Sequence, residues 1–195
     1  MELIQFLTDQ GVLLSAGHSN ATFEESSRGF KQGIRAVTHL FNAMSGLHHR
    51  QTGLPGATFL TEDVHASIIA DGIHVSYEAL AMSKKILGER LFLITDAVEE
   101  SSSGVYSHQR RGDHFALPDG TLSGSALTQM QAVANCVQHA GISLDEALRM
   151  ASLYPARLFG APDQGSLEAG NRANITIFDH DYHVKQVFLD GKKQL

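Results

Sequence analysis

The chain has 195 residues, 43% of them hydrophobic and 18% charged, and carries a formal net charge of −6 at pH 7, which is ordinary for a globular protein with its own core. The acidic balance argues against a nucleic-acid surface, which needs clustered Lys and Arg, and no apolar run approaches the roughly 20 residues of a membrane-spanning helix. Met1–Ile4 lacks the basic region of a signal peptide, and Cys136 has no second cysteine to pair with. We therefore expect a cytoplasmic protein. From its charge and hydropathy we expect it to bind neither nucleic acid nor membrane.

Apolar, β-branched runs alternate with helical patterns over most of the chain. The expected strands are residues 12–16, 35–40, 64–70 and 91–95. The expected helices are residues 2–10, a helix opened by the capping-box sequence Thr22–Glu25, one from Ser76 to Gly88, and three after residue 126, beginning near Leu127, Ser143 and Tyr154. A His- and Gly-rich loop is expected at 45–56 and a long polar excursion at 99–120.

This alternation predicts an α/β fold with βαβ units and a parallel sheet. Four βα units make half of a TIM-type (β/α)8 barrel, which usually takes about 250 residues. We therefore predict that residues 1–164 form the second half of such a barrel. In residues 165–195 two strand patterns follow one another without a helix between them, which predicts a small antiparallel β element.

Each of the four strands leads into a residue suited to metal binding or to acid–base chemistry. These residues are His18, His39, His74 and Asp96. The carboxyl ends of parallel strands meet on the face where α/β barrels build their active sites. Two imidazoles one βα unit apart suit a zinc-type ion, and a carboxylate at a strand end suits proton transfer. The alternative is that these side chains only form hydrogen bonds or helix caps at strand ends.

Five motifs around these residues occur in the order found in one enzyme family. They are Ser15–Asn20, Thr38–Met44, Ala70–Val75, Ile94–Ala97 and Gly120–Ser125. Together they resemble the N-acetylglucosamine-6-phosphate deacetylases of the amidohydrolase superfamily, from about residue 10 to the C-terminus, and 165–174 looks like the superfamily's return to its small β domain. The resemblance implies metal-dependent hydrolysis of N-acetylglucosamine 6-phosphate to glucosamine 6-phosphate and acetate.

The resemblance also implies roles for single residues. His18 and His39 would bind a divalent metal, zinc, and Asp96 would be the catalytic acid and base. Asn42 and the Ala43 backbone would hold the substrate phosphate, and Arg50 would assist them across the interface of a homodimer. The remaining substrate contacts would be Asp71, Gly72, Ile73 and His74 on the sugar, and Leu122, Ser123 and Gly124 on the acetyl and sugar side.

One ligand of the family's metal has no counterpart in this sequence. The family's third ligand is a glutamate in a His-Leu-Glu-Gly-Pro-type motif, and no such motif occurs here. We therefore expect the C-terminal portion of such an enzyme. Two alternatives remain open, a non-catalytic sugar-phosphate-binding or assembly module and an amidohydrolase acting on another amide. The conformation of 98–120 is not predicted, and His108 and His114 are expected to be structural or surface residues.

Overall fold

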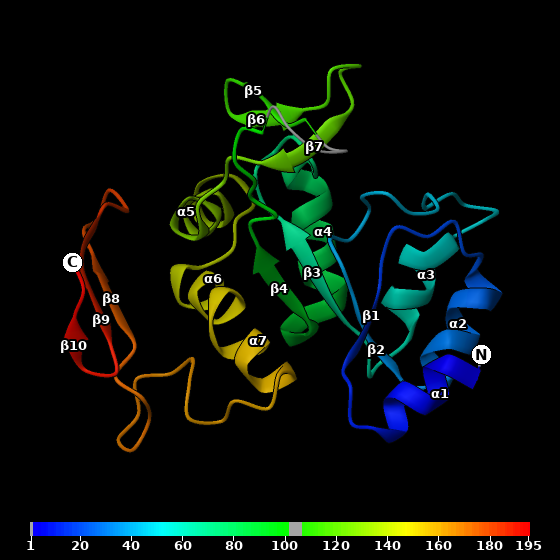
Figure 1. Cartoon of the computed structure of the whole chain (residues 1–195), viewed down its shortest axis with the longest axis horizontal. Helices are drawn as coiled ribbons and strands as arrows, with labels where there is room; N and C mark the ends of the chain where they lie inside the picture. The colour runs from blue at the N-terminus through cyan, green and yellow to red at the C-terminus, as the bar shows by residue number, and fades with distance from the viewer. Residues whose placement is uncertain (1, 102–106) are drawn as a thin grey trace.

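The computed structural model describes residues 2–101 and 107–195, and its centre is a four-stranded parallel sheet (Figure 1). The strands follow one another across the sheet in chain order, β1-β2-β3-β4. Their bounds are Leu14–Ala16, Ile34–Val37, His65–Ile69 and Leu91–Ile94. All three neighbouring pairs are parallel, so the α/β class and the parallel sheet are confirmed.

Helices connect these strands in the expected rhythm. Those of the first part are α1 (Glu2–Asp9), α2 (Phe23–Lys31), α3 (Gly53–Leu60), α4 (Tyr77–Leu87) and the 3-10 turn η1 (Gly88–Arg90). The capping box predicted for α2 is present, because the Glu25 N–H donates to the Thr22 hydroxyl at 3.2 Å and the Thr22 N–H donates to the Glu25 carboxylate at 2.9 Å. The expected loop at 45–56 is shorter than predicted, since α3 already begins at Gly53.

The core lies between the sheet and the helices that cover it. In β3 the four residues after His65 are all buried, and Leu91, Phe92 and Leu93 of β4 are buried as well. Strands covered on both faces carry continuous apolar runs rather than alternating ones. That is why these strands are recognisable in the sequence.

Three helices follow in the second part of the chain, α5 (Gln129–His139), α6 (Leu144–Ala151) and α7 (Leu153–Leu158). The Glu146 carboxylate ties α6 to its neighbours by accepting from Lys84 of α4, from Arg149 at 2.7 Å and from the Tyr154 hydroxyl at 2.8 Å. Burial opposes ionisation of Glu146, but these three donors outweigh it and lower the pKa to about 2. The carboxylate therefore stabilises the packing of α4, α6 and α7.

The polar excursion between β4 and α5 contains a sheet of its own. The antiparallel strands β5 (Gln109–Arg111), β6 (His114–Ala116) and β7 (Leu122–Ser125) form it, and we call it the insert sheet. It lies over the C-terminal ends of β3 and β4 (Figure 1). The sequence did not predict β5, because this strand is short and entirely exposed and shows no apolar alternation. Residues 102–106 of the excursion lie outside the described residues.

A second antiparallel sheet closes the chain, in the order β10-β9-β8. Its strands are β8 (Ile175–Phe178), β9 (Val184–Leu189) and β10 (Lys192–Lys193). It lies beyond α5–α7, away from the parallel sheet (Figure 1). β8 and β9 occur where two strands were predicted, whereas β10 is too short to show a pattern. Among the described residues no helix is long and apolar enough to cross a membrane.

Candidate active site

The chemistry-bearing residues share one position relative to their strands. The parallel strands end at Ala16, Val37, Ile69 and Ile94, and the residues two positions later are His18, His39, Asp71 and Asp96. Ala16 pairs with Val37 and Ile69 pairs with Ile94, so β1 ends level with β2 and β3 ends level with β4. The strand β3 continues past the end of β2, because Val37 pairs with Ala66. All four residues therefore follow the carboxyl ends of the strands. Three of them, His18, His39 and Asp96, are residues predicted for strand ends, whereas after β3 this position is taken by Asp71 and the predicted His74 lies three residues further on.

Three of these residues have a strained backbone. The φ angles are +46° at His18, +36° at His39 and +51° at Asp96. A left-handed conformation costs a residue with a Cβ about 1–2 kcal/mol, and such strain concentrates at functional sites. The strain sets the direction in which each side chain leaves its strand. Positive φ occurs also at Phe41, Ala43, Tyr182 and Asp190, so it accompanies the three residues predicted for metal binding and proton transfer but is not confined to them.

His18 and His39 lie side by side. Their ring centroids are 4.8 Å apart and the ring planes are inclined by 66°. His39 is only 5% exposed, and its backbone N–H donates to the Ser67 hydroxyl at 2.8 Å. Its Nδ1 atom is buried and has no hydrogen-bond partner within the described part of the chain. A buried polar atom left unpaired costs about 1–3 kcal/mol, so this pair of imidazoles fits two ligand positions of a zinc-type ion.

Asp96 lies exposed beside the insert sheet. Its carbonyl accepts from the Ser125 N–H at 2.9 Å, and a Cβ on Gly124 would lie 3.2 Å from the same oxygen and 2.7 Å from the Val98 side chain. This close approach places the predicted substrate segment 122–124 against the loop that carries Asp96. Gly124 has a φ of +80°, so the approach requires a glycine for backbone conformation and for space.

The insert sheet contributes a contact that the sequence did not reveal. The Ser123 hydroxyl lies 2.8 Å from the Nδ1 atom of His108, whose position in a polar segment without a recognisable element gave no signal. His114 of β6 pairs with Asp113 at 3.1 Å. Both histidines were expected to be structural or surface residues, and the pairing of His108 with Ser123 brings one of them to a predicted substrate residue.

The predicted phosphate residues lie in the loop after β2. The Asn42 amide donates to the carbonyl oxygens of His39 and Leu40, both at 3.3 Å, and Ala43 accepts from the Ser19 N–H at 3.0 Å. The loops after β1 and β2 are thereby joined. Arg50 is exposed, and within the described part of the chain its guanidinium forms a hydrogen bond only with the neighbouring His49 ring, at 3.1 Å. Among residues 2–101 and 107–195 no carboxylate pairs with Arg50, and no described contact joins it to Asn42 or Ala43.

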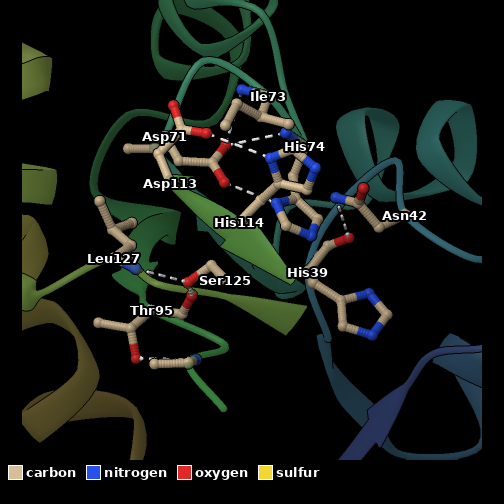
Figure 2. A network of polar contacts seen from close by, with 12 residues as sticks. His39, Asn42, Asp71, Ile73, His74, Thr95, Asp113, His114, Ser125 and Leu127 are labelled. Carbon is tan, nitrogen blue, oxygen red and sulfur yellow. Dashed lines mark hydrogen bonds and ion pairs between the residues drawn. The ribbon is translucent and has the colours of Figure 1, made fainter. Parts of the chain in front are cut away.

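Asp71 and His74 form a buried pair after β3 (Figure 2). The Asp71 Oδ2 atom lies 2.6 Å from the His74 Nδ1 atom, and the two side chains are only 6% and 5% exposed. Burial opposes ionisation of Asp71, but hydrogen bonds from the His74 ring and from the backbone N–H groups of Ile73 and His74 lower its pKa. Figure 2 shows the pair in the same region as His39 and Asn42.

One further group of side chains has metal-type spacing. Ligand atoms of Asp179, Asp181 and His183 lie within 4.8 Å of one another, between β8 and β9. The Asp179 carboxylate already accepts from Lys185 at 2.8 Å and from backbone N–H groups. This group is the only such set of three in the described residues. At the edge of the parallel sheet, no third His, Cys, Asp or Glu of the described residues completes such a set with His18 and His39.

Comparison with known proteins gives one consistent family. The model of the amidohydrolase family matches residues 2–193. An N-acetylglucosamine-6-phosphate deacetylase from Haemophilus influenzae is 37% identical over 93% of this chain and 50% of its own length. An N-acetylgalactosamine-6-phosphate deacetylase from Escherichia coli O157:H7 is 36% identical over 98% of this chain and 53% of its own length.

Solved structures agree with these relatives. The crystal structure of N-acetylglucosamine-6-phosphate deacetylase from Pasteurella multocida superposes with a TM-score of 0.94 at 35% identity, over 99% of this chain and 53% of that one. The chain therefore spans about half the length of the curated relatives and of the solved structure that it matches.

Proposed function

Because this chain belongs to the amidohydrolase family, we propose that it carries the second half of the active site of a metal-dependent deacetylase for N-acetylglucosamine 6-phosphate. The products would be glucosamine 6-phosphate and acetate. The observation that carries the proposal is the buried, unpaired Nδ1 atom of His39 beside the His18 ring. Asp96 follows a strand of the same sheet at the equivalent position.

His18 and His39 would hold the divalent ion, zinc, and the family's glutamate would be the third ligand. No described residue takes that third position. A zinc ion bound there would supply a polarised substrate carbonyl and an activated water. Asp96, exposed at the strand end, would take the proton of that water and return it to the departing sugar nitrogen.

The remaining predicted residues would bind the sugar phosphate. Asn42 and the Ala43 backbone would contact the phosphate from the loop after β2. Arg50 lacks a described acidic partner and is exposed, which supports our proposal that it reaches a phosphate across the interface of a homodimer, since a guanidinium binds phosphate in a bidentate manner. His74, held in place by the turn 71–73, would face the sugar, and 122–124 would line the acetyl side.

We also propose that the parallel sheet is half of a (β/α)8 barrel, with residues 165–195 forming a separate small β element. The strand order β1-β2-β3-β4 and the half-length match to the relatives support this. The activity of the whole enzyme would then belong to the complete barrel, to which this chain contributes four consecutive strands.

Zinc binding tests the site separately from turnover. The unmodified chain should bind zinc in titration calorimetry, and His39→Ala should weaken binding at least about tenfold because one of two imidazole ligands is lost. The matched control is His180→Ala, which removes a histidine that is 90% exposed in the turn between β8 and β9. Equal zinc affinity in His39→Ala and the unmodified chain would refute the assignment.

The substrate is tested by deacetylation with zinc present. Because the full activity would belong to the complete barrel, we expect this chain by itself to release acetate from N-acetylglucosamine 6-phosphate far more slowly than a full-length relative. The 4-epimer, N-acetylgalactosamine 6-phosphate, belongs in the same assay because one relative acts on it by name. Arg50→Ala should reduce activity on the phosphorylated sugar far more than on N-acetylglucosamine. An equal loss on both would favour an amidohydrolase for another amide.

A second candidate function is a non-catalytic sugar-phosphate-binding or assembly module. The observation that favours it is the two-donor set at the sheet edge, since catalytic zinc sites usually have three protein ligands. Calorimetric binding of glucosamine 6-phosphate, with no zinc in elemental analysis and no acetate release, would identify this function.

A further inference from the structure

The Asp71 carboxylate is fully engaged within the protein. Its Oδ1 atom accepts from the Ile73 N–H at 2.9 Å and the His74 N–H at 2.8 Å, while Oδ2 faces the His74 ring at 2.6 Å. The side chain is only 6% exposed. Because both carboxylate oxygens are already engaged within this turn, we expect Asp71 to act on a ligand through His74 and not by direct contact, which revises the sugar contact expected for Asp71.

We propose that Asp71 is a positioning residue that holds the proton of the neutral His74 ring on Nδ1, so that Nε2 faces the site as a hydrogen-bond acceptor. This inference rests on the proposed sugar-phosphate site and adds the chemistry of its recognition. An ionised carboxylate can only accept hydrogen bonds, so the ring nitrogen beside it must donate. The nitrogen left without a proton accepts, and the groups that it recognises are sugar hydroxyls.

The turn that carries this pair is fixed from behind by two helices. The Asn135 amide of α5 donates to the Ala70 carbonyl at 2.8 Å, and the Tyr77 hydroxyl of α4 donates to the Asp71 carbonyl at 3.3 Å. The Gly72 backbone, with φ of +77°, passes so close to the Tyr77 ring that a Cβ would lie 2.7 Å from it. Because these contacts fix the backbone at the start of the turn, the carboxylate determines the orientation and the tautomer of the ring.

His74 offers one nitrogen for a ligand. Its Nδ1 atom is occupied by Asp71, whereas no hydrogen bond to Nε2 is found among the residues that the structure describes. A surface ion pair would allow the ring to rotate and to exchange its proton between nitrogens, whereas a pair that is 5% and 6% exposed does not. The geometry thus provides a single acceptor of fixed direction.

The substitution that tests the proposal is Asp71→Asn. The asparagine oxygen can still accept from the two backbone N–H groups and preserve the turn, while its NH2 group faces the ring and can only donate. The His74 tautomer should then reverse. Nitrogen-15 NMR of the histidine rings at pH 9, with the His74 signal assigned by its loss in His74→Gln, reports which nitrogen carries the hydrogen.

We expect the unmodified chain to show hydrogen on Nδ1 of His74 and Asp71→Asn to show it on Nε2. Calorimetric affinity for glucosamine 6-phosphate should fall roughly tenfold in Asp71→Asn, because a buried acceptor has been replaced by a donor. The control is Asp181→Asn, which changes an exposed aspartate 3.3 Å from the His180 ring and should leave both readings unchanged.

The outcomes separate this inference from the proposed function. Hydrogen on Nε2, or on both nitrogens, in the unmodified chain would overturn the inference, as would an unchanged affinity in Asp71→Asn with a reversed tautomer. If the unmodified chain shows hydrogen on Nδ1 but binds no sugar phosphate, the tautomer assignment stands and the proposed function fails. If Asp71→Asn does not fold, the NMR spectrum of the unmodified chain still tests whether Asp71 holds the ring proton on Nδ1 of His74.

Discussion

The left-handed backbone at Asp96 makes a prediction about folding stability that is independent of catalysis. The φ angle there is +51°, and the side chain is exposed. Replacing Asp96 with alanine or with glycine therefore removes little packing, and the two variants differ mainly in how easily each residue adopts this conformation. Glycine adopts it freely, whereas alanine has a Cβ that opposes it.

The expected difference follows from two opposing terms. The left-handed conformation costs alanine about 1–2 kcal/mol, while glycine loses about 0.5–1 kcal/mol through the greater freedom of its unfolded chain. Asp96→Gly should therefore be more stable than Asp96→Ala by roughly 0.5–1 kcal/mol. For a chain of this size, 1 kcal/mol corresponds to a Tm difference of about 2–4 °C.

The assay is urea or thermal unfolding of both variants beside a matched pair in a helix. Met82 lies in the middle of α4 and is 45% exposed, and there Met82→Gly should be less stable than Met82→Ala by about 1 kcal/mol. The order of glycine and alanine should thus reverse between the two positions. The same order at both positions would refute a left-handed backbone at Asp96.

Three further predictions concern the rest of the fold. The folded pKa of Glu146 lies near 2, below its ordinary value of 4.5, so the stabilisation by its carboxylate is complete above pH 4.5 and is lost as the pH falls towards 2. The unfolding free energy of the unmodified chain should therefore fall between pH 7 and pH 3. In Glu146→Gln this fall should be smaller by about 1–2 kcal/mol once screening is allowed for. Gly72→Ala places a Cβ 2.7 Å from the Tyr77 ring and should cost clearly more stability than Gly160→Ala, which has a similar φ and no atom within 4 Å; equal losses in thermal unfolding would contradict the contact. Burial raises the pKa of the Cys136 thiol to about 12, so iodoacetamide at pH 8 should modify it only after unfolding, and rapid labelling of the folded chain would disprove its burial.

The sequence predicted the parallel sheet, and the polar residues that follow its strands, for a physical reason. Strands covered on both faces leave continuous apolar runs, and a polar residue just beyond such a run must lie at the strand end. Asp96 could therefore be located from the pattern, because β4 is largely buried. The strands before His18 and His39 contain exposed residues, and these histidines were located by their repeated place after apolar runs. The position of His74 was predicted as well, although the residue at the equivalent strand position is Asp71.

Other parts of the site depend on contacts that no pattern records. The strands of the insert sheet are short, and β5 is fully exposed, so apolar periodicity could not reveal them. The contact between His108 and Ser123 depends on this sheet. One tight turn likewise encloses Asp71, whose carboxylate contacts the backbone N–H groups of residues 73 and 74 and the ring of His74. The His39 Nδ1 atom has no described hydrogen-bond partner, and this depends on which side chains the tertiary structure brings next to it, which a sequence pattern does not record.

The insert sheet leaves and rejoins the fold at a single point. The Ser125 N–H donates to the Asp96 carbonyl at 2.9 Å, and the Val98 N–H donates to the Ser125 carbonyl at 3.1 Å. These two hydrogen bonds close the segment at its base, and lengthening a closed loop costs little additional entropy. Evolution can therefore exchange, lengthen or shorten residues 99–123 as a module while the Asp96 backbone stays in place. Substrate preference can diverge in the insert without a change in the residue that would move the proton.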